Sequence, residues 1–374
     1  MLLCIFMKKN SEIYLTNHQY TLILIGSIIG IGMLSLPNSV VKIAKQDGWI
    51  SAAIGGIYVI YMVLIGSYMC KKHPDNNILD LSKIYFGNFL GTILNLIFTS
   101  YFIYLLTGLS SGISNVLIMY ITPFLTTKKI LITILLVPAF ISYKGIKTLG
   151  KMNEVIFYLT FIFFLVPMVA LKDGNILNIM PVFSSGFKNI IKASKESLFS
   201  YFGIEILFLI YPFLKDKKKV TSSGIKASIV AIIIYTWITF ITIYYIGINI
   251  IPKFLWPVVT VSESIMVPGI NSFRYISMSL WTLMIFKTIS IDYFSIAYCL
   301  GEIWRKINMK TWIYILYPVL FYISGIYGTP TNRRDIIIKL GKMYAIFNLV
   351  YVTSIAILIM LKRGEKNVTE NKKS

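Results

Sequence analysis

Charged residues are scarce in this chain of 374 residues. Asp, Glu, Lys and Arg together make up 14% of it, whereas hydrophobic residues make up 56%. A soluble globular chain carries about 25% charged residues, and the mean hydropathy here is +0.74. The composition therefore excludes an ordinary soluble enzyme or nucleic-acid-binding domain, and it predicts a protein whose main solvent is the lipid bilayer.

Cysteine and histidine are almost absent as well. The three cysteines, Cys4, Cys70 and Cys299, are too few and too scattered for a disulfide framework or a metal cage. His18 and His73 lie far apart, and neither has a second ligand at the spacing of a zinc site. The motifs GxSxG and HExxH and the P-loop are missing too. We therefore predict no enzyme activity, no metal and no cofactor.

Long apolar runs dominate what is present, and several reach the length of about 20 residues that a helix needs to span a bilayer. The connections between them are too short to hold a soluble domain. We predict an all-α integral membrane protein of about ten transmembrane helices, with a cytoplasmic N-terminus over 1–19, a membrane domain over 20–361 and a polar cytoplasmic tail over 362–374. The expected spans are 20–43, 49–70, 88–114, 129–143, 153–171, 196–214, 224–248, 273–301, 309–326 and 341–361.

Positive charge is unevenly distributed between the two sides of this topology. If the N-terminus is inside, most Lys and Arg residues fall in cytoplasmic segments, as the positive-inside rule expects. Both termini are thus predicted to be cytoplasmic. The lysine-rich run 215–219 is interpreted as a topology anchor, and Arg333 and Arg334 as charges of an outer segment. No nucleic-acid partner is expected, because no soluble basic domain is present.

Three glycines and a proline weaken the first span between Gly26 and Pro37. A broken helix at membrane depth occurs only where its backbone is buried or lines a cavity, and transporters bind substrates at such breaks. Unwinding at Gly30 and Gly32 would free backbone groups, and the second half-helix would offer its N-terminus to a carboxylate. The alternative is close helix packing through Gly26 and Gly30, which form a small-xxx-small pair.

Span six carries related features. In a five-plus-five inverted repeat, the plan of many transporters, spans one and six correspond and both are broken. Span six contains Ser200 and Gly203 beside the acidic residue Glu205. Tyr101 and Tyr104 of span three could flank the same pocket. The predicted substrate-binding residues are Ser27, Gly30, Ile31, Gly32, Tyr101, Ser200 and Gly203.

Glu205 and Lys287 place ionisable groups in the middle of spans six and eight. An acidic side chain at the bilayer centre costs at least about 2.5 kcal/mol to insert, so it needs a partner, a cavity or a proton. Three interpretations are open: a structural Glu205–Lys287 ion pair, a proton-coupling carboxylate, and a contact with a substrate amine. Asp292 follows Lys287 in the same span and has no assigned role.

In their order and spacing, these motifs resemble the endospore germination permease-like family. Its members are the B subunits of nutrient germinant receptors and are related to the amino acid/polyamine/organocation transporters. The family often has an acidic residue beside the arginine that opens span eight, whereas Arg274 here lies between Phe273 and Tyr275 and is expected to lose a charge partner. The matching pieces, which extend over nearly the whole chain, are Gly30–Pro37, the short helix around Leu79–Gly87, Gly203–Glu205, Tyr211–Phe213, Trp256–Pro257 and Trp281.

The resemblance implies a receptor subunit in the inner spore membrane that binds a small nutrient, typically an amino acid. It also implies assembly with an A-type subunit and a lipoprotein C-type subunit. Binding would shift a conformational equilibrium that commits the spore to germinate. Two alternatives stay open: a stand-alone proton- or sodium-coupled amino acid transporter, and a scaffold subunit with a vestigial pocket. Substitution of Gly30 or Gly32 with valine would impair a receptor or a transporter, whereas a scaffold subunit would keep its function.

Overall fold

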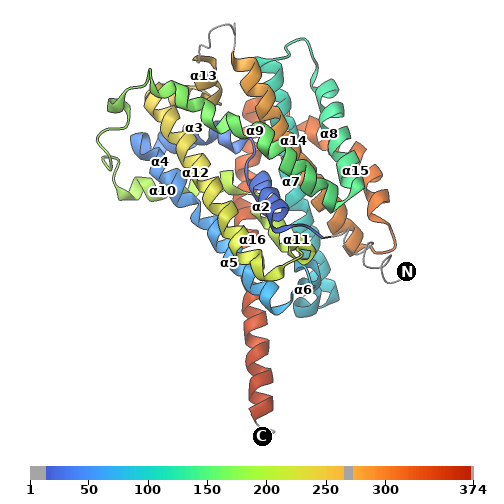
Figure 1. Cartoon of the computed structure of the whole chain (residues 1–374). Helices are drawn as coiled ribbons and strands as arrows, with labels where there is room; N and C mark the ends of the chain where they lie inside the picture. The colour runs from blue at the N-terminus through green and yellow to red at the C-terminus, as the bar shows by residue number, and fades with distance from the viewer. Residues whose placement is uncertain (1–13, 265–272, 372–374) are drawn as a thin grey trace.

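The computed structural model describes residues 14–264 and 273–371. Within these ranges the chain consists of helices and short connections, and the one isolated β-bridge joins Leu15 to Leu214. The helices form one bundle, and α16 (Pro330–Asn371) extends beyond it at the end where α6 (Ile78–Phe86) lies (Figure 1). The opposite end carries α13 (Pro257–Ser264).

The helices have the length and composition of membrane spans. Among the described residues, seven helices are long and apolar enough to cross a membrane, and an eighth joins them if the bent pair in span six counts as one span. The predicted all-α membrane architecture is confirmed, and the number ten stays a prediction. Six of the seven coincide wholly or largely with α7 (Asn88–Tyr120), α9 (Ile146–Leu165), α12 (Val220–Ile246), α14 (Phe273–Ile303), α15 (Met309–Ile326) and α16, and the seventh, Gly32–Lys72, contains α5 (Ile57–Lys72). A further helix of 18 residues, α8 (Thr127–Lys144), is not among them.

Span one is broken where its glycines predict. A capping box starts α2 (Asn17–Ile28), because the Thr16 side chain accepts a hydrogen bond from the backbone N–H of Gln19 while the Gln19 side chain accepts one from the N–H of Thr16. The helix ends at Ile28, and a new helix, α3, runs over Gly32–Ala44. The predicted interruption is therefore confirmed.

Span six is broken as well, and its break is wider. α10 (Phe187–Leu198) leads into the short 3₁₀ helix η4 (Phe199–Tyr201), and the chain resumes as η5 (Ile204–Ile206) and α11 (Leu207–Ile210). The two parts are bent by 53° relative to each other. Gly203 lies between them with a φ of 108°, a left-handed conformation that favours glycine.

α14 is the central helix of the bundle. In its most apolar window 83% of the residues are buried, more than in any other candidate span among the described residues. It packs against α2, α7, α8 and α9. The polar side chains of α14 between residues 287 and 295 are therefore held inside the protein and away from lipid.

α16 begins earlier than the expected span 341–361. Thr329 starts it, since its hydroxyl accepts a hydrogen bond from the N–H of Asn332 at 3.3 Å and its carbonyl accepts one from the N–H of Arg333 at 3.0 Å. Pro330 is the first helical residue, where its missing N–H costs nothing. As a result, Arg333 and Arg334 belong to the first turn of a helix, and not to a loop.

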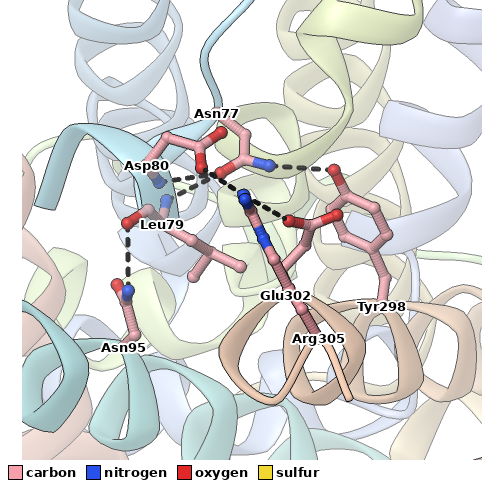
Figure 2. Close-up of polar contacts among 7 residues, drawn as sticks. All are labelled: Asn77, Leu79, Asp80, Asn95, Tyr298, Glu302 and Arg305. Atoms are coloured by element: carbon pink, nitrogen blue, oxygen red, sulfur yellow. Dashed lines mark hydrogen bonds and ion pairs between the residues drawn. The ribbon is translucent and has the colours of Figure 1, made fainter. Parts of the chain in front are cut away.

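The short helix α6, expected from the sequence, is fixed against α7 and α14 (Figure 2). Asn77 caps it by accepting hydrogen bonds from the N–H groups of Leu79 and Asp80, and its amide donates to the Tyr298 hydroxyl of α14 at 2.8 Å. Further contacts come from Asn95, which donates to the Leu79 carbonyl, and from Arg305, which bridges Asp80 and Glu302.

Candidate functional site

The breaks in spans one and six touch each other, and a cavity lies beside them. A Cβ atom built on Gly203 would lie 2.1 Å from the Ser27 carbonyl oxygen, so only glycine allows this contact. The cavity has a volume of about 170 Å³. Pockets for drug-sized ligands measure about 300–1,000 Å³, so this one suits a smaller molecule.

Most of the predicted binding residues line this cavity. Its wall contains Ser27, Gly30, Ile31 and Gly32 from span one and Ser200 from span six. The two segments are closely packed, because a Cβ atom on Gly32 would lie 3.1 Å from the Cα atom of Ser200. Their role in binding stays a prediction.

Tyr101, Gly203 and Glu205 lie behind the wall of this cavity. The Tyr101 hydroxyl donates to Glu205 Oε2 at 2.6 Å and accepts a hydrogen bond from the N–H of Gly203 at 3.0 Å. That N–H also lies 2.9 Å from Glu205 Oε2. Tyr58 of α5 and Asn348 of α16 donate to the other carboxylate oxygen. We call these four partners the Glu205 cage, and it ties the break in span six to three long helices.

The structure does not form the Glu205–Lys287 ion pair that was one of the open interpretations. Lys287 is fully buried, and its Nζ atom has no hydrogen-bond partner among the described residues. It lies 5.4 Å from the centre of the Phe157 ring, on the α9 side of α14. Glu205 is instead surrounded by hydroxyl and amide donors. The coupling role of both residues stays a prediction.

One side of the cavity carries a buried carboxyl group to which the sequence gave no role. Asp292 lines the cavity, is 1% exposed, and has no hydrogen-bond partner at either carboxylate oxygen. Thr288 lies one helical turn before it, and its hydroxyl is 2.8 Å from the Gly26 carbonyl oxygen and 2.9 Å from that of Ile29. Both carbonyls belong to the C-terminal end of α2, where helix carbonyls lack intrahelical partners. The sequence could have indicated that Thr288 and Asp292 act together, because they are four residues apart and residues i and i+4 share a helix face.

Another side of the cavity carries positive charge. Arg333 and Arg334 line it, although the sequence suggested that they belong to an outer segment. The buried Arg333 donates from Nε to the Gly108 carbonyl at 2.8 Å, and Arg334 donates to Oδ1 of Asn38 at 3.0 Å. The sequence signal that could have placed them in a helix is Thr329 followed by Pro330.

Aromatic residues also line the cavity. Tyr104, which the sequence analysis paired with Tyr101, lines the cavity, and so does Trp256 just before α13. Arg274 nearby is not deprived of a charge partner, because its Nη1 atom lies 2.6 Å from Oε1 of Glu263. The expectation from local sequence was wrong because the partner comes from another helix, α13.

Two broken spans and a small central cavity define an all-helical membrane protein with a transporter fold, and solved structures agree. MHP1, a nucleobase-cation-symport-1 family transporter in a closed conformation with bromovinylhydantoin bound, matches with a TM-score of 0.65 at 14% identity, over 92% of this chain and 77% of that one. A Na⁺-coupled sialic acid symporter in a substrate-bound outward-open state matches with a TM-score of 0.63 at 14% identity, over 93% and 78%.

Within this fold class, the chain belongs to the spore germination protein family, whose model matches residues 14–333. Spore germination protein YndE of Bacillus subtilis (strain 168) is 24% identical over 361 residues, which cover 94% of this chain and 98% of that protein. Spore germination protein GerQB of Bacillus cereus is 26% identical over 330 residues, which cover 87% and 88%. The resemblance found in the sequence is thereby confirmed.

Proposed function

We propose that the chain is a subunit of a nutrient germinant receptor that binds a small nutrient of the amino acid class and triggers spore germination. The observation that carries this proposal is the cavity at the break of span one, in a chain whose relatives are spore germination proteins. The N-terminus of α3, which no side chain caps, provides a site for a carboxylate. A nutrient that binds one conformation of the bundle better than another shifts the equilibrium between them.

The proposal includes a location and partners. The protein spans the spore inner membrane with both termini in the cytoplasm, and it assembles with an A-type subunit and a lipoprotein C-type subunit. The unequal distribution of lysine and arginine supports the orientation. The α6 end of the bundle, from which α16 extends, is then the cytoplasmic end.

A stand-alone amino acid transporter is the second candidate, because the matched solved structures are transporters. Uptake of labelled amino acids into vesicles that contain only this chain would favour it. A response that requires A-type and C-type genes beside this one would favour the receptor.

The first test is germination of spores that lack this gene, on a panel of amino acids, nucleosides and sugars. We expect selective loss of the response to one nutrient class and restoration by the intact gene. Normal germination on every compound would contradict a receptor that alone serves one nutrient.

Gly32→Ala tests whether the site lies at the break of span one. The new Cβ atom would lie 3.1 Å from the Cα atom of Ser200, so the two broken spans must move apart and the response should be lost. Gly325→Ala in α15 is the matched control, because nothing lies within 4 Å of its Cβ position. Immunoblots of spore membranes must show equal amounts of both variants. A normal dose response of Gly32→Ala would remove this break from the site.

A further inference from the structure

The Asp292 carboxyl group lines the cavity and has no partner among the described residues. It is 1% exposed, and neither oxygen accepts a hydrogen bond among the described residues. Buried carboxylates in membrane proteins are expensive and pair with other groups. Lys287 does not pair with it, since the ammonium group faces the Phe157 ring of α9. Five residues of α-helix also turn the two side chains about 140° apart around α14.

The surroundings of Asp292 attract positive charge. The Thr288 hydroxyl lies within hydrogen-bond distance of three carbonyl oxygens, those of Gly26, Ile29 and Met284, but it has one hydrogen to donate. The carbonyls of Gly26 and Ile29 therefore keep accepting capacity for another donor. The C-terminal end of a helix such as α2 also carries a partial negative charge.

The opposite polarity lies at the start of α3. A Cβ atom on Gly112 would meet the side chain of Ile31 at 2.4 Å and the guanidinium carbon of Arg333 at 2.6 Å. Arg333 is thus next to the residue that precedes α3, where the helix N-terminus is positive. The break of span one separates an acidic wall, Thr288 and Asp292 with the end of α2, from a basic wall, Arg333 and Arg334 with the start of α3, and Glu196 lines the cavity as well.

We infer that Asp292 binds the ammonium group of a small zwitterionic ligand, whose carboxylate faces the start of α3 and the two arginines. The inference rests on the proposed function, and it names the ligand class and the orientation of the ligand across the break. An ammonium group donates up to three hydrogen bonds, and both oxygens of Asp292 lack a hydrogen-bond partner among the described residues. A sugar or a nucleoside offers no charge for either wall.

The first arm of the experiment uses spores and the nutrient panel. Complete absence of a gene-dependent response would overturn the proposed function, and this inference with it. A gene-dependent response to sugars or nucleosides alone would leave the receptor in place and overturn the ammonium site. The expected result is a gene-dependent response to amino acids.

The second arm compares Asp292→Asn with Asp335→Asn, which makes the same chemical change at an exposed position of α16. For Asp292→Asn we expect the half-maximal amino acid concentration to rise at least about tenfold, since a charged hydrogen bond to the ligand is lost. Asp335→Asn should respond as wild type. Unchanged dose response of Asp292→Asn overturns the inference. If that variant is absent from spore membranes, Asp292→Glu, which keeps the charge, takes its place and should retain a preference for amines.

The third arm needs no substitution. Thermal unfolding of the purified full chain is measured with L-alanine and L-lactate, with L-valine and 2-hydroxyisovalerate, and with sodium or choline chloride alone. Stabilisation by an amino acid but not by its hydroxy acid supports the ammonium site. Equal stabilisation by an amino acid and its hydroxy acid overturns the ammonium site. Stabilisation by sodium chloride alone also overturns it if the Asp292→Asn variant no longer shows that stabilisation.

Discussion

Two buried carboxylates close to the breaks have opposite surroundings. Glu205 accepts hydrogen bonds from Tyr58, Tyr101, Asn348 and the N–H of Gly203. Asp292, equally buried, accepts none from the described residues and lines the cavity. The difference separates two uses of an acid inside a membrane protein. A carboxylate with a full set of donors stabilises the fold, whereas one without donors is available to a ligand.

The largest effect is expected from Gly203→Ala, which disrupts the Glu205 cage at its backbone. The added Cβ atom would lie 2.1 Å from the Ser27 carbonyl oxygen, and φ is 108°. The left-handed conformation alone costs an alanine about 1–3 kcal/mol, and the clash adds to it. We expect little or no protein in the membrane. Gly186→Ala has a φ of 78° and nothing within 4 Å, so it measures the backbone cost by itself.

The protein level of both variants is measured by immunoblot, and the thermal stability of any purified protein is measured in detergent. Equal stability of Gly203→Ala and Gly186→Ala would show that the contact between the two broken spans is not needed for folding.

Glu205→Gln should have an intermediate effect. The amide has one acceptor oxygen where the carboxylate has two, and its NH₂ group would face a hydroxyl donor. Each lost hydrogen bond to a charged group costs about 1.5–3 kcal/mol. We expect a lower unfolding temperature, retained membrane insertion and a weaker response to every nutrient alike. Asp292→Asn should instead change the response to amines.

A Glu205→Gln variant of normal stability that loses the response to one nutrient would contradict this division. It would place Glu205 in the binding site and favour the contact with a substrate amine, one of the three interpretations that the sequence left open.

Lys287→Met should have the smallest effect, and the effect should be stabilising. Its Nζ atom is buried without a hydrogen-bond partner among the described residues, and an unsatisfied buried group costs about 1–3 kcal/mol or more. Methionine has a similar length and no charge. We expect a higher unfolding temperature than wild type, with Lys226→Met, an exposed lysine of α12, as the control. A lower unfolding temperature would show that Lys287 has a partner. Loss of the response at higher stability would support its coupling role.

Both helix breaks were predictable from the sequence because their causes are local. Gly30 and Gly32 weaken helix α2–α3 wherever they lie, and Gly203 adopts a conformation that other residues avoid. The short helix over Ile78–Phe86 was predictable too, since its apolar residues recur at helical intervals. Glycines and apolar spacing act within a few residues, so a single sequence reveals them.

The partners of the buried charges were not predictable in the same way. The sequence suggested an ion pair between Glu205 and Lys287 because both residues lie in mid-span. In the structure their side chains face different helices. The sequence suggested that Arg274 lacks a charge partner because its neighbours in the chain are aromatic. In the structure its partner is Glu263, which belongs to α13. Rotation of a helix about its axis decides such contacts, and that rotation depends on the packing of all its neighbours.

The sequence by itself determined that the protein is helical, lies in a membrane, is broken in spans one and six, and is related to spore germination proteins. Composition and local glycine chemistry suffice for the first three conclusions, since they depend on solvent and on backbone freedom, whereas the relation to spore germination proteins came from the resemblance of the motifs in their order and spacing. Only the tertiary structure decided that Glu205 is enclosed and that Asp292, Arg333 and Arg334 line the cavity. The physical reason is that a charge is satisfied by groups close in space, and these come from helices far apart in the chain.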